Sequence, residues 1–296
     1  RNKRINNGAL IFDKSEIKFK LDEKNQPVKI LFKTAKSANK LIEEFMLLAN
    51  KKVAEKMKQS NERFVYRVHD QPDHEKLENL QTIVKRLGYN LKLSSSELNG
   101  SLNDLLKKAF GKNEQNLIDT LMIRSMSKAE YTTKNIGHYG LSFENYTHFT
   151  SPIRRYPDVL VHRLIQAEIK KEKIKTEEIE TLCKHSTHME ILATKAERDS
   201  IKLMQIKYML DKEGEVFDAV ISGVIARGVF VEVVENKCEG MVKAKDLPGD
   251  YFVHDQKNHS FVGEKTGKKY QLGDKTRVML VKADKVKKRL DFQVLN

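Results

Sequence analysis

The chain has 296 residues, of which 39% are hydrophobic, and its 55 Lys and Arg against 41 Asp and Glu give a formal net charge of +14. This composition excludes a disordered chain, and because no long apolar run and no signal-like start are present we expect neither a membrane-spanning nor a secreted protein. The cationic excess makes a polyanion the first partner to consider, with a merely soluble basic surface as the alternative.

The first two thirds of the chain are predicted to be mostly helical after a strand-rich start. Short apolar runs between turn residues predict strands at residues 9–12, 17–21 and 28–32. Apolar residues at helical spacing predict amphipathic helices at residues 37–57, 75–87, 102–110, 114–129 and 186–211. In the first helix we expect the core to be contacted by Leu41, Phe45, Leu48, Ala49, Val53 and Met57.

A change of sequence character near Gly214 predicts a domain boundary. Residues 1–213 carry a net charge of +11 and residues 214–296 only +3, so the basic excess belongs to the helical part. After Gly214, five β-branched runs predict strands at residues 216–221, 228–233, 240–242, 278–281 and 289–292. We therefore predict an α+β fold: a mostly helical part followed by a five-stranded OB-type barrel, a common nucleic-acid binder, with a purely structural small barrel as the alternative.

The stretch Tyr-Thr-His-Phe-Thr-Ser-Pro-Ile-Arg-Arg-Tyr-Pro-Asp at residues 146–158 carries most of the chemical information. Ser151 is a good N-cap and Pro152 suits a first helical position, which would put Arg154 and Arg155 in the first helical turn. Free backbone N–H groups, the helix dipole and two guanidinium groups there predict a phosphate site. A basic helix start paired with nearby carboxylates is the alternative, and Pro157 would either kink the helix or start a new one.

Several motifs, in order along the chain, closely resemble those of the ribonuclease II / ribonuclease R exoribonuclease family. They are LIEEFMLLAN (41–50), YRVHDQP (66–72), GHYGL (137–141), THFTSPIRRYPD (147–158) and VHRLI (161–165). The Tyr-Pro-Asp after the paired arginines and the residues Asp-Tyr-Phe at 250–252 resemble the ribonuclease R branch more than ribonuclease II. The last part, from Gly214, resembles the S1 domain that closes these enzymes, so the resemblance implies residues 1–213 as the carboxyl-terminal part of an RNB catalytic domain and 214–296 as S1.

This resemblance implies a processive 3′→5′ hydrolysis of RNA to nucleoside monophosphates, with Mg²⁺ at the catalytic centre. Arg154 matches the arginine that contacts the scissile phosphate, and Arg155 matches a basic neighbour. Glu197 falls where some members have a supporting glutamate in the active site. Phe12 matches an aromatic that stacks on the terminal base, and Glu43 matches a residue that reads the ribose. From the residues alone, the favoured alternatives are Phe12 as a core residue and Glu43 as the partner of a lysine.

In the S1 segment, Phe230 is a stacking candidate. Arg227 stands where many relatives have an aromatic residue, and Lys243 where many have histidine. Both changes replace stacking with attraction for phosphate, so we expect RNA binding that is sensitive to salt and weakly selective for sequence.

One departure from the family concerns the metal. The family holds Mg²⁺ with aspartates spaced Asp-x5-Asp-x-Asp-Asp, and this spacing occurs nowhere in the chain, so we expect no metal ligands here and little or no nuclease activity from the isolated chain. The expected partners are single-stranded 3′ ends of RNA, with structured RNA left open, and no membrane. Cys183 and Cys238 indicate no disulfide framework, so we expect a reducing, cytoplasmic compartment. We also expect a monomer. A non-catalytic RNA-binding module or an inactive family member is the alternative.

Overall fold

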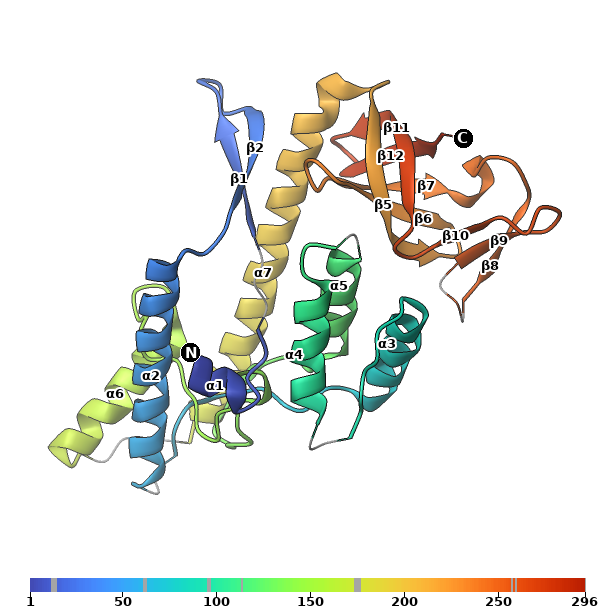
Figure 1. Ribbon diagram of the computed structural model, residues 1–296. Coiled ribbons are helices and arrows are strands. Elements are labelled where there is room, and N and C mark those ends of the chain that lie inside the picture. The colour runs from blue at the N-terminus through green and yellow to red at the C-terminus, as the bar shows by residue number, and fades with distance from the viewer. Residues whose placement is uncertain are drawn as a thin grey trace. The chain divides into compact units, whose positions relative to one another are not determined.

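The computed structural model describes residues 1–11, 15–60, 63–94, 97–112, 114–172, 177–256, 258 and 260–295. The chain forms two compact units, one made of Arg1–Lys14 and Thr34–Thr194 and the other of Ser15–Lys33 and Lys195–Asn296. One long helix, α7 (Ile179–Met209), continues from the first unit into the second (Figure 1). None of the described helices combines the length and apolar character needed to span a bilayer.

The first unit is mainly helical and has two apolar cores. Besides the start of α7 it contains α1 (Asn2–Asn6), α2 (Ser37–Lys58), β3 (Tyr66–Val68), α3 (His74–Arg86), α4 (Leu98–Ala109), α5 (Gln115–Ser125), β4 (Glu130–Thr132), a short 3-10 helix (Tyr139–Leu141) and α6 (Tyr156–Lys170). One core lies among α3, α4 and α5, around Leu80, Leu102 and Ile118. The other joins the end of α2, the antiparallel pair β3–β4, α6 and the start of α7.

Helix α3 shows how local sequence signals set the ends of these elements. The Asp73 side chain accepts a hydrogen bond from the backbone N–H of Lys76 at 3.2 Å, and so caps the helix start. At the other end Gly88 has φ +83°, a left-handed conformation that glycine adopts without strain and that stops the helix. The predicted helix at residues 75–87 is therefore confirmed to within a residue.

The predicted strand at residues 9–12 is not formed in its described part. Ala9 to Ile11 have no strand partner. The N–H groups of Ala9 and Leu10 donate to the carbonyl oxygens of Arg4 and Gly140, and a side chain of α4 satisfies two further backbone groups. The Asn103 amide donates to the carbonyl oxygen of Ala9 at 2.9 Å and accepts from the N–H of Ile11 at 3.3 Å. Phe12, the fourth residue of the predicted strand, lies outside the described residues.

Helix α2 is formed as predicted, but only its second half packs as the pattern suggested. Met57 and the neighbouring Ala54 are buried in the second core of the first unit. In the first half, Leu41, Phe45 and Leu48 are 57%, 62% and 50% exposed, so the prediction that they contact the core is wrong for the described structure. The apolar face is real, yet no described element covers it.

The second unit is built on the predicted five-stranded barrel. Besides the end of α7 it contains β1 (Glu16–Leu21), β2 (Pro27–Lys33), β5 (Val216–Ile225), β6 (Gly228–Val233), β7 (Glu239–Lys243), β8 (Phe252–Asp255), β9 (Ser260–Gly263), β10 (Lys269–Gln271), β11 (Lys275–Asp284), β12 (Arg289–Val294) and two 3-10 turns (Leu210–Lys212, Ala244–Asp246). The barrel closes in the order β11-β12-β7-β6-β5, which confirms the predicted α+β fold with an OB-type barrel. The insertion before the fourth barrel strand forms a separate sheet, in the order β10-β9-β8.

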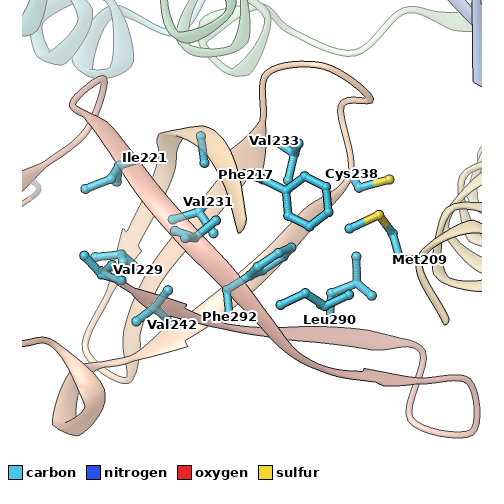
Figure 2. Packing of buried hydrophobic residues seen from close by; sticks show 14 of the residues in the cluster. Met209, Phe217, Ile221, Val229, Val231, Val233, Cys238, Val242, Leu290 and Phe292 are labelled. Atoms are coloured by element: carbon cyan, nitrogen blue, oxygen red, sulfur yellow. The ribbon is translucent and has the colours of Figure 1, made fainter. Parts of the chain in front are cut away.

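The barrel core also anchors two elements from earlier in the chain. Val231, Leu290 and Phe292 fill its interior, and Met209 at the end of α7 belongs to the same buried cluster (Figure 2). Ile30 of the antiparallel hairpin β1–β2 belongs to the same buried cluster. The hairpin and the last turns of α7 are therefore parts of the barrel unit.

Candidate functional site

The arginine pair of the motif lies on a closed turn, not in the first turn of a helix. The backbone N–H groups of Arg154 and Arg155 both donate to the carbonyl oxygen of Ser151, at 3.3 and 3.0 Å. Arg155 is extended, with φ −124° and ψ 115°, and α6 begins at Tyr156 with Pro157 in its first turn. The predicted helix start at Ser151 is therefore wrong, because the Pro157 ring would clash with the preceding helical turn. Of the two alternatives for Pro157, the structure shows a new helix.

The two arginines have different surroundings. Asp158 is completely buried, and its Oδ1 accepts hydrogen bonds from Nη2 of Arg155 at 2.7 Å and from the N–H of Ser151 at 2.8 Å. Arg155 thus adopts the alternative that the sequence left open, pairing with a nearby carboxylate. The role of Arg155 in contacting RNA stays a prediction.

The Arg154 side chain is exposed and makes no hydrogen bond or ion pair with any residue that the structure describes. Its neighbour Ile153 is also fully exposed, at 101%. The turn therefore presents a guanidinium group with its charge uncompensated and its five N–H donors available, the form in which arginine binds phosphate oxygens best.

Hydrogen bonds from buried polar residues hold the segment that precedes the arginine turn. The side chain of Asn50, from α2, donates to the hydroxyl of Tyr146 at 3.1 Å and accepts from the backbone N–H of Phe149 at 3.0 Å. The hydroxyl of Tyr131, from β4, lies 2.8 Å from Nδ1 of His148. Two elements distant in sequence thus fix the strand-like segment that precedes the arginine turn.

Two buried histidines of this region, His138 and His148, are held neutral. Burial lowers the pKa of His148 to about 2, and the cations Arg155 and Arg67 act in the same direction. Burial also lowers the pKa of His138 to about 3, with further help from His69. Nδ1 of a neutral His148 ring can accept a hydrogen bond from the Tyr131 hydroxyl, whereas a fully protonated ring cannot. The site is therefore built for neutral histidines behind a cationic turn.

Glu43, the predicted ribose-reading residue, is exposed on α2 and forms no ion pair with a described residue. The next residue, Glu44, is bound instead: its Oε1 accepts from Nη2 of Arg4 at 2.6 Å, and this hydrogen bond lowers its pKa. Asn50, seven positions later on the same helix, is buried, whereas Glu43 is exposed.

Two other predicted site residues cannot be placed beside Arg154. Glu197 is exposed on the part of α7 that belongs to the second unit, whereas Arg154 belongs to the first. Phe12 lies outside the described residues. Their assigned roles stay predictions.

The barrel brings two of the three predicted S1 contacts onto one face. Phe230 pairs with Met241, and Gly228 with Lys243, across the antiparallel strands β6 and β7. Alternate residues of a strand point to the same side, so Phe230 and Lys243 are diagonal neighbours on the outer face. A Cβ at Gly223 would lie 3.2 Å from the Phe230 ring, so this glycine makes room for the aromatic side chain over β5.

Arg227 is exposed in the turn between β5 and β6, next to Gly228. Gly228 has φ +153°, and any Cβ there would overlap the carbonyl oxygen of Val242. The tight turn that carries Arg227 therefore requires glycine. Arg227 and Lys243 therefore both lie at the Gly228 end of the β6–β7 pair, two residues from Phe230 along β6. An aromatic ring with cations nearby is suited to a flexible single strand of nucleic acid.

A divalent metal finds no ready site in the part of the chain that is described. No group of three or more His, Cys, Asp or Glu side chains lies close enough there to hold an ion. A two-metal phosphoryl-transfer site needs several oxygen ligands, so these residues do not fit the Mg²⁺ that the family resemblance implies.

Sequence reasoning gave no role to Asp158 or Asn50, although both lie within the motifs. Their importance depends on which atoms face them in three dimensions. A partly buried ion pair between Arg67 and Glu190, at 2.6 Å, was missed for the same reason, because its partners are 123 positions apart. For Asn50 and Asp158 the local signal was a polar residue at an otherwise buried position of a helix.

Comparison with known proteins gives concordant similarities along the chain. Residues 1–171 match the family model of the RNB domain, and residues 210–295 match that of the S1 RNA binding domain. Ribonuclease R of Aquifex aeolicus is 38% identical over 297 residues, which cover 99% of this chain and 42% of that protein. The chain thus spans about two fifths of the length of this relative.

Solved structures show the same similarity. The apo form of Mycoplasma genitalium RNase R superposes with a TM-score of 0.93 at 26% identity, covering 99% of this chain and 47% of that one. The complex of the same protein with ribose methylated single-stranded RNA gives the same TM-score of 0.93.

Proposed function

The chain belongs to the RNB-domain family of ribonucleases, and we propose that it forms the carboxyl-terminal part of a 3′→5′ exoribonuclease that hydrolyses RNA to nucleoside 5′-monophosphates. The observation that carries the proposal is the exposed, uncompensated guanidinium of Arg154 on a turn held by buried contacts. The similarity to a protein whose structure is known in complex with ribose methylated single-stranded RNA supports RNA as the polyanion.

In this proposal Arg154 stabilises the negative charge that develops on the scissile phosphate. A preorganised cation does this without the cost of reorganising during the reaction. Glu43, exposed and unpaired among the described residues, accepts a hydrogen bond from a ribose 2′-OH, which distinguishes RNA from DNA. Glu197 supports the reacting end and Phe12 stacks on the terminal base.

The S1 barrel would guide the strand to this site. Phe230 offers a ring on which any base can stack, and Arg227 and Lys243 attract the backbone phosphates. Binding of this type depends on the charge of the backbone, so it weakens as salt rises and varies little with base sequence.

Mg²⁺ would activate the attacking water and neutralise phosphate charge in the complete enzyme. The described residues do not offer its ligands, so we infer that another segment supplies them and that this chain alone releases little or no monophosphate. The uncovered apolar face of α2, with Leu41, Phe45 and Leu48 at least half exposed, supports docking of such a segment, because a face of this size seldom stays in water.

A chimera tests the proposal. The matching region of Aquifex aeolicus ribonuclease R is replaced by this chain, and release of nucleoside monophosphates from labelled single-stranded RNA is measured with Mg²⁺. We expect an active chimera whose turnover falls about a hundredfold or more with Arg154→Ala. Arg163→Ala, which changes an exposed arginine of α6, is the matched control and should leave turnover unchanged.

The alternative is an RNA-binding module or an inactive family member, and the lack of a metal-ligand cluster among the described residues favours it. A chimera that binds RNA but releases nothing would establish this alternative. Monophosphate release by the isolated chain would contradict the inference that its metal ligands come from another segment.

A further inference from the structure

Asp158 closes a ring of contacts around the arginine turn. It lies in the first turn of α6, and its carboxylate is completely buried. One oxygen, Oδ1, receives two hydrogen bonds, from the backbone N–H of Ser151 at 2.8 Å and from Nη2 of Arg155 at 2.7 Å. The carboxylate thus ties the first and last residues of the turn to the helix that follows it.

These contacts restrain the backbone of Arg154 without touching its side chain. The Ser151 carbonyl accepts from the N–H groups of Arg154 and Arg155, while the Ser151 N–H is held by Asp158. Both polar groups of the Ser151 backbone are therefore committed. Since Arg155 is tied to the same carboxylate, Arg154 is the arginine of the pair that remains exposed.

The ion pair is a weak source of stability. Nε of Arg155 and Oδ2 of Asp158 are buried, and neither has a hydrogen-bond partner among the described residues. Burying two charges costs desolvation energy that an incompletely hydrogen-bonded pair does not fully recover. Its main physical effect is to select one conformation of the turn.

We propose that Asp158 is a positioning residue for RNA: it holds the turn so that Arg154 meets a backbone phosphate, with Arg155 as a tether and not as a second phosphate ligand. The inference rests on the proposed function, in which Arg154 contacts RNA. It assigns different roles to two arginines that are adjacent and chemically identical in the sequence.

A double-mutant cycle on the full chain tests the proposal. The affinity for a fluorescein-labelled single-stranded RNA is measured by anisotropy at several salt concentrations for Arg154→Ala, Asp158→Asn and the double variant. We expect Arg154→Ala to bind about tenfold more weakly, the value of one hydrogen bond between charged groups, with a salt slope smaller by about one ion. Asp158→Asn should lose a similar factor and a similar part of the slope, and the double variant should bind no more weakly than Arg154→Ala.

Additive losses, or unchanged binding by Asp158→Asn, would overturn the positioning role while leaving the Arg154 assignment intact. Unchanged binding by Arg154→Ala would instead refute the assigned role of Arg154, and the positioning role with it. Asp73→Asn, the same substitution at the start of α3, is the control and should leave affinity unchanged. Circular dichroism verifies folding, and if Asp158→Asn does not fold, the same cycle with Arg155→Lys must show the same non-additivity.

Discussion

Acidification is expected to destabilise the first unit through two buried histidines. Burial lowers the pKa of His138 to about 3 and that of His148 to about 2, against an ordinary value of 6.5. The folded state keeps both rings neutral, whereas the unfolded state takes up a proton on each below about pH 6.5. The unfolded state therefore binds more protons, so stability is complete above about pH 6.5 and falls as the pH drops toward the folded-state pKa values.

The size of the effect follows from the shifts. One pKa unit corresponds to about 1.4 kcal/mol, so one pH unit below 6.5 each histidine costs about 1.4 kcal/mol and the two together about 3 kcal/mol. His69, whose pKa burial also lowers, adds to the loss in the same direction. A small domain has a free energy of unfolding of about 5 to 15 kcal/mol, so the loss is a large fraction of the total.

Urea unfolding followed by far-UV circular dichroism at about pH 7.5, 6.5 and 5.5 measures this loss. His148→Asn keeps an acceptor for the Tyr131 hydroxyl, because the asparagine Oδ1 takes the place of Nδ1, but it removes the titrating ring. We expect its stability to depend on pH less steeply, by about 1.4 kcal/mol per pH unit. Tyr131→Phe removes the same hydrogen bond from the other side, so it should lower stability at every pH and keep the slope. A stability that is flat between about pH 7.5 and 5.5, or a full slope in His148→Asn, would refute this reasoning.

Two further predictions concern the barrel. Phe230→Ala should weaken RNA binding by about 1 to 3 kcal/mol without changing the dependence of affinity on salt concentration, whereas Lys243→Gln should lower that salt slope by about one ion. Anisotropy titrations at several salt concentrations distinguish the two effects, and a changed slope in Phe230→Ala would contradict the stacking role. Gly228→Ala should destabilise the barrel by at least about 1 to 3 kcal/mol, since an alanine there would be strained and would overlap the Val242 carbonyl; a thermal transition unchanged from wild type would show that the turn can relax.

The periodicity of apolar residues predicted which helices form, but it predicted less well which parts of the protein those helices contact. The spacing of Leu41, Phe45 and Leu48 correctly indicated an apolar face on α2, because a helical repeat depends on the sequence of that helix alone. What covers the face depends on other elements, and those described leave it exposed. Met57, in the same stripe, is buried because α6 and β3 pack at that end.

At the arginine turn, a contact from the following helix overrides the local sequence signal for a helix start. Ser151 followed by Pro152 is a typical helix start, and that was the prediction. In the structure the backbone N–H of Ser151 is taken by Asp158, which comes seven residues later and is placed by the packing of α6. A single contact of this kind, together with Pro157, converts a predicted helical turn into a closed turn that precedes the helix.

The net charge of +14 predicted a polyanion as partner but did not show which cations are available to it. The structure separates the arginines of the first unit by their partners. Arg4, Arg67 and Arg155 are each bound to a carboxylate at 2.6 to 2.7 Å. A guanidinium in such a pair attracts phosphate less strongly, because the carboxylate already compensates its charge. Releasing the guanidinium to bind phosphate would leave the carboxylate unpaired in a partly or fully buried site. Arg154 has no carboxylate partner among the described residues that RNA binding would leave unpaired. At this turn it is therefore the side chain whose positive charge is available to bind RNA.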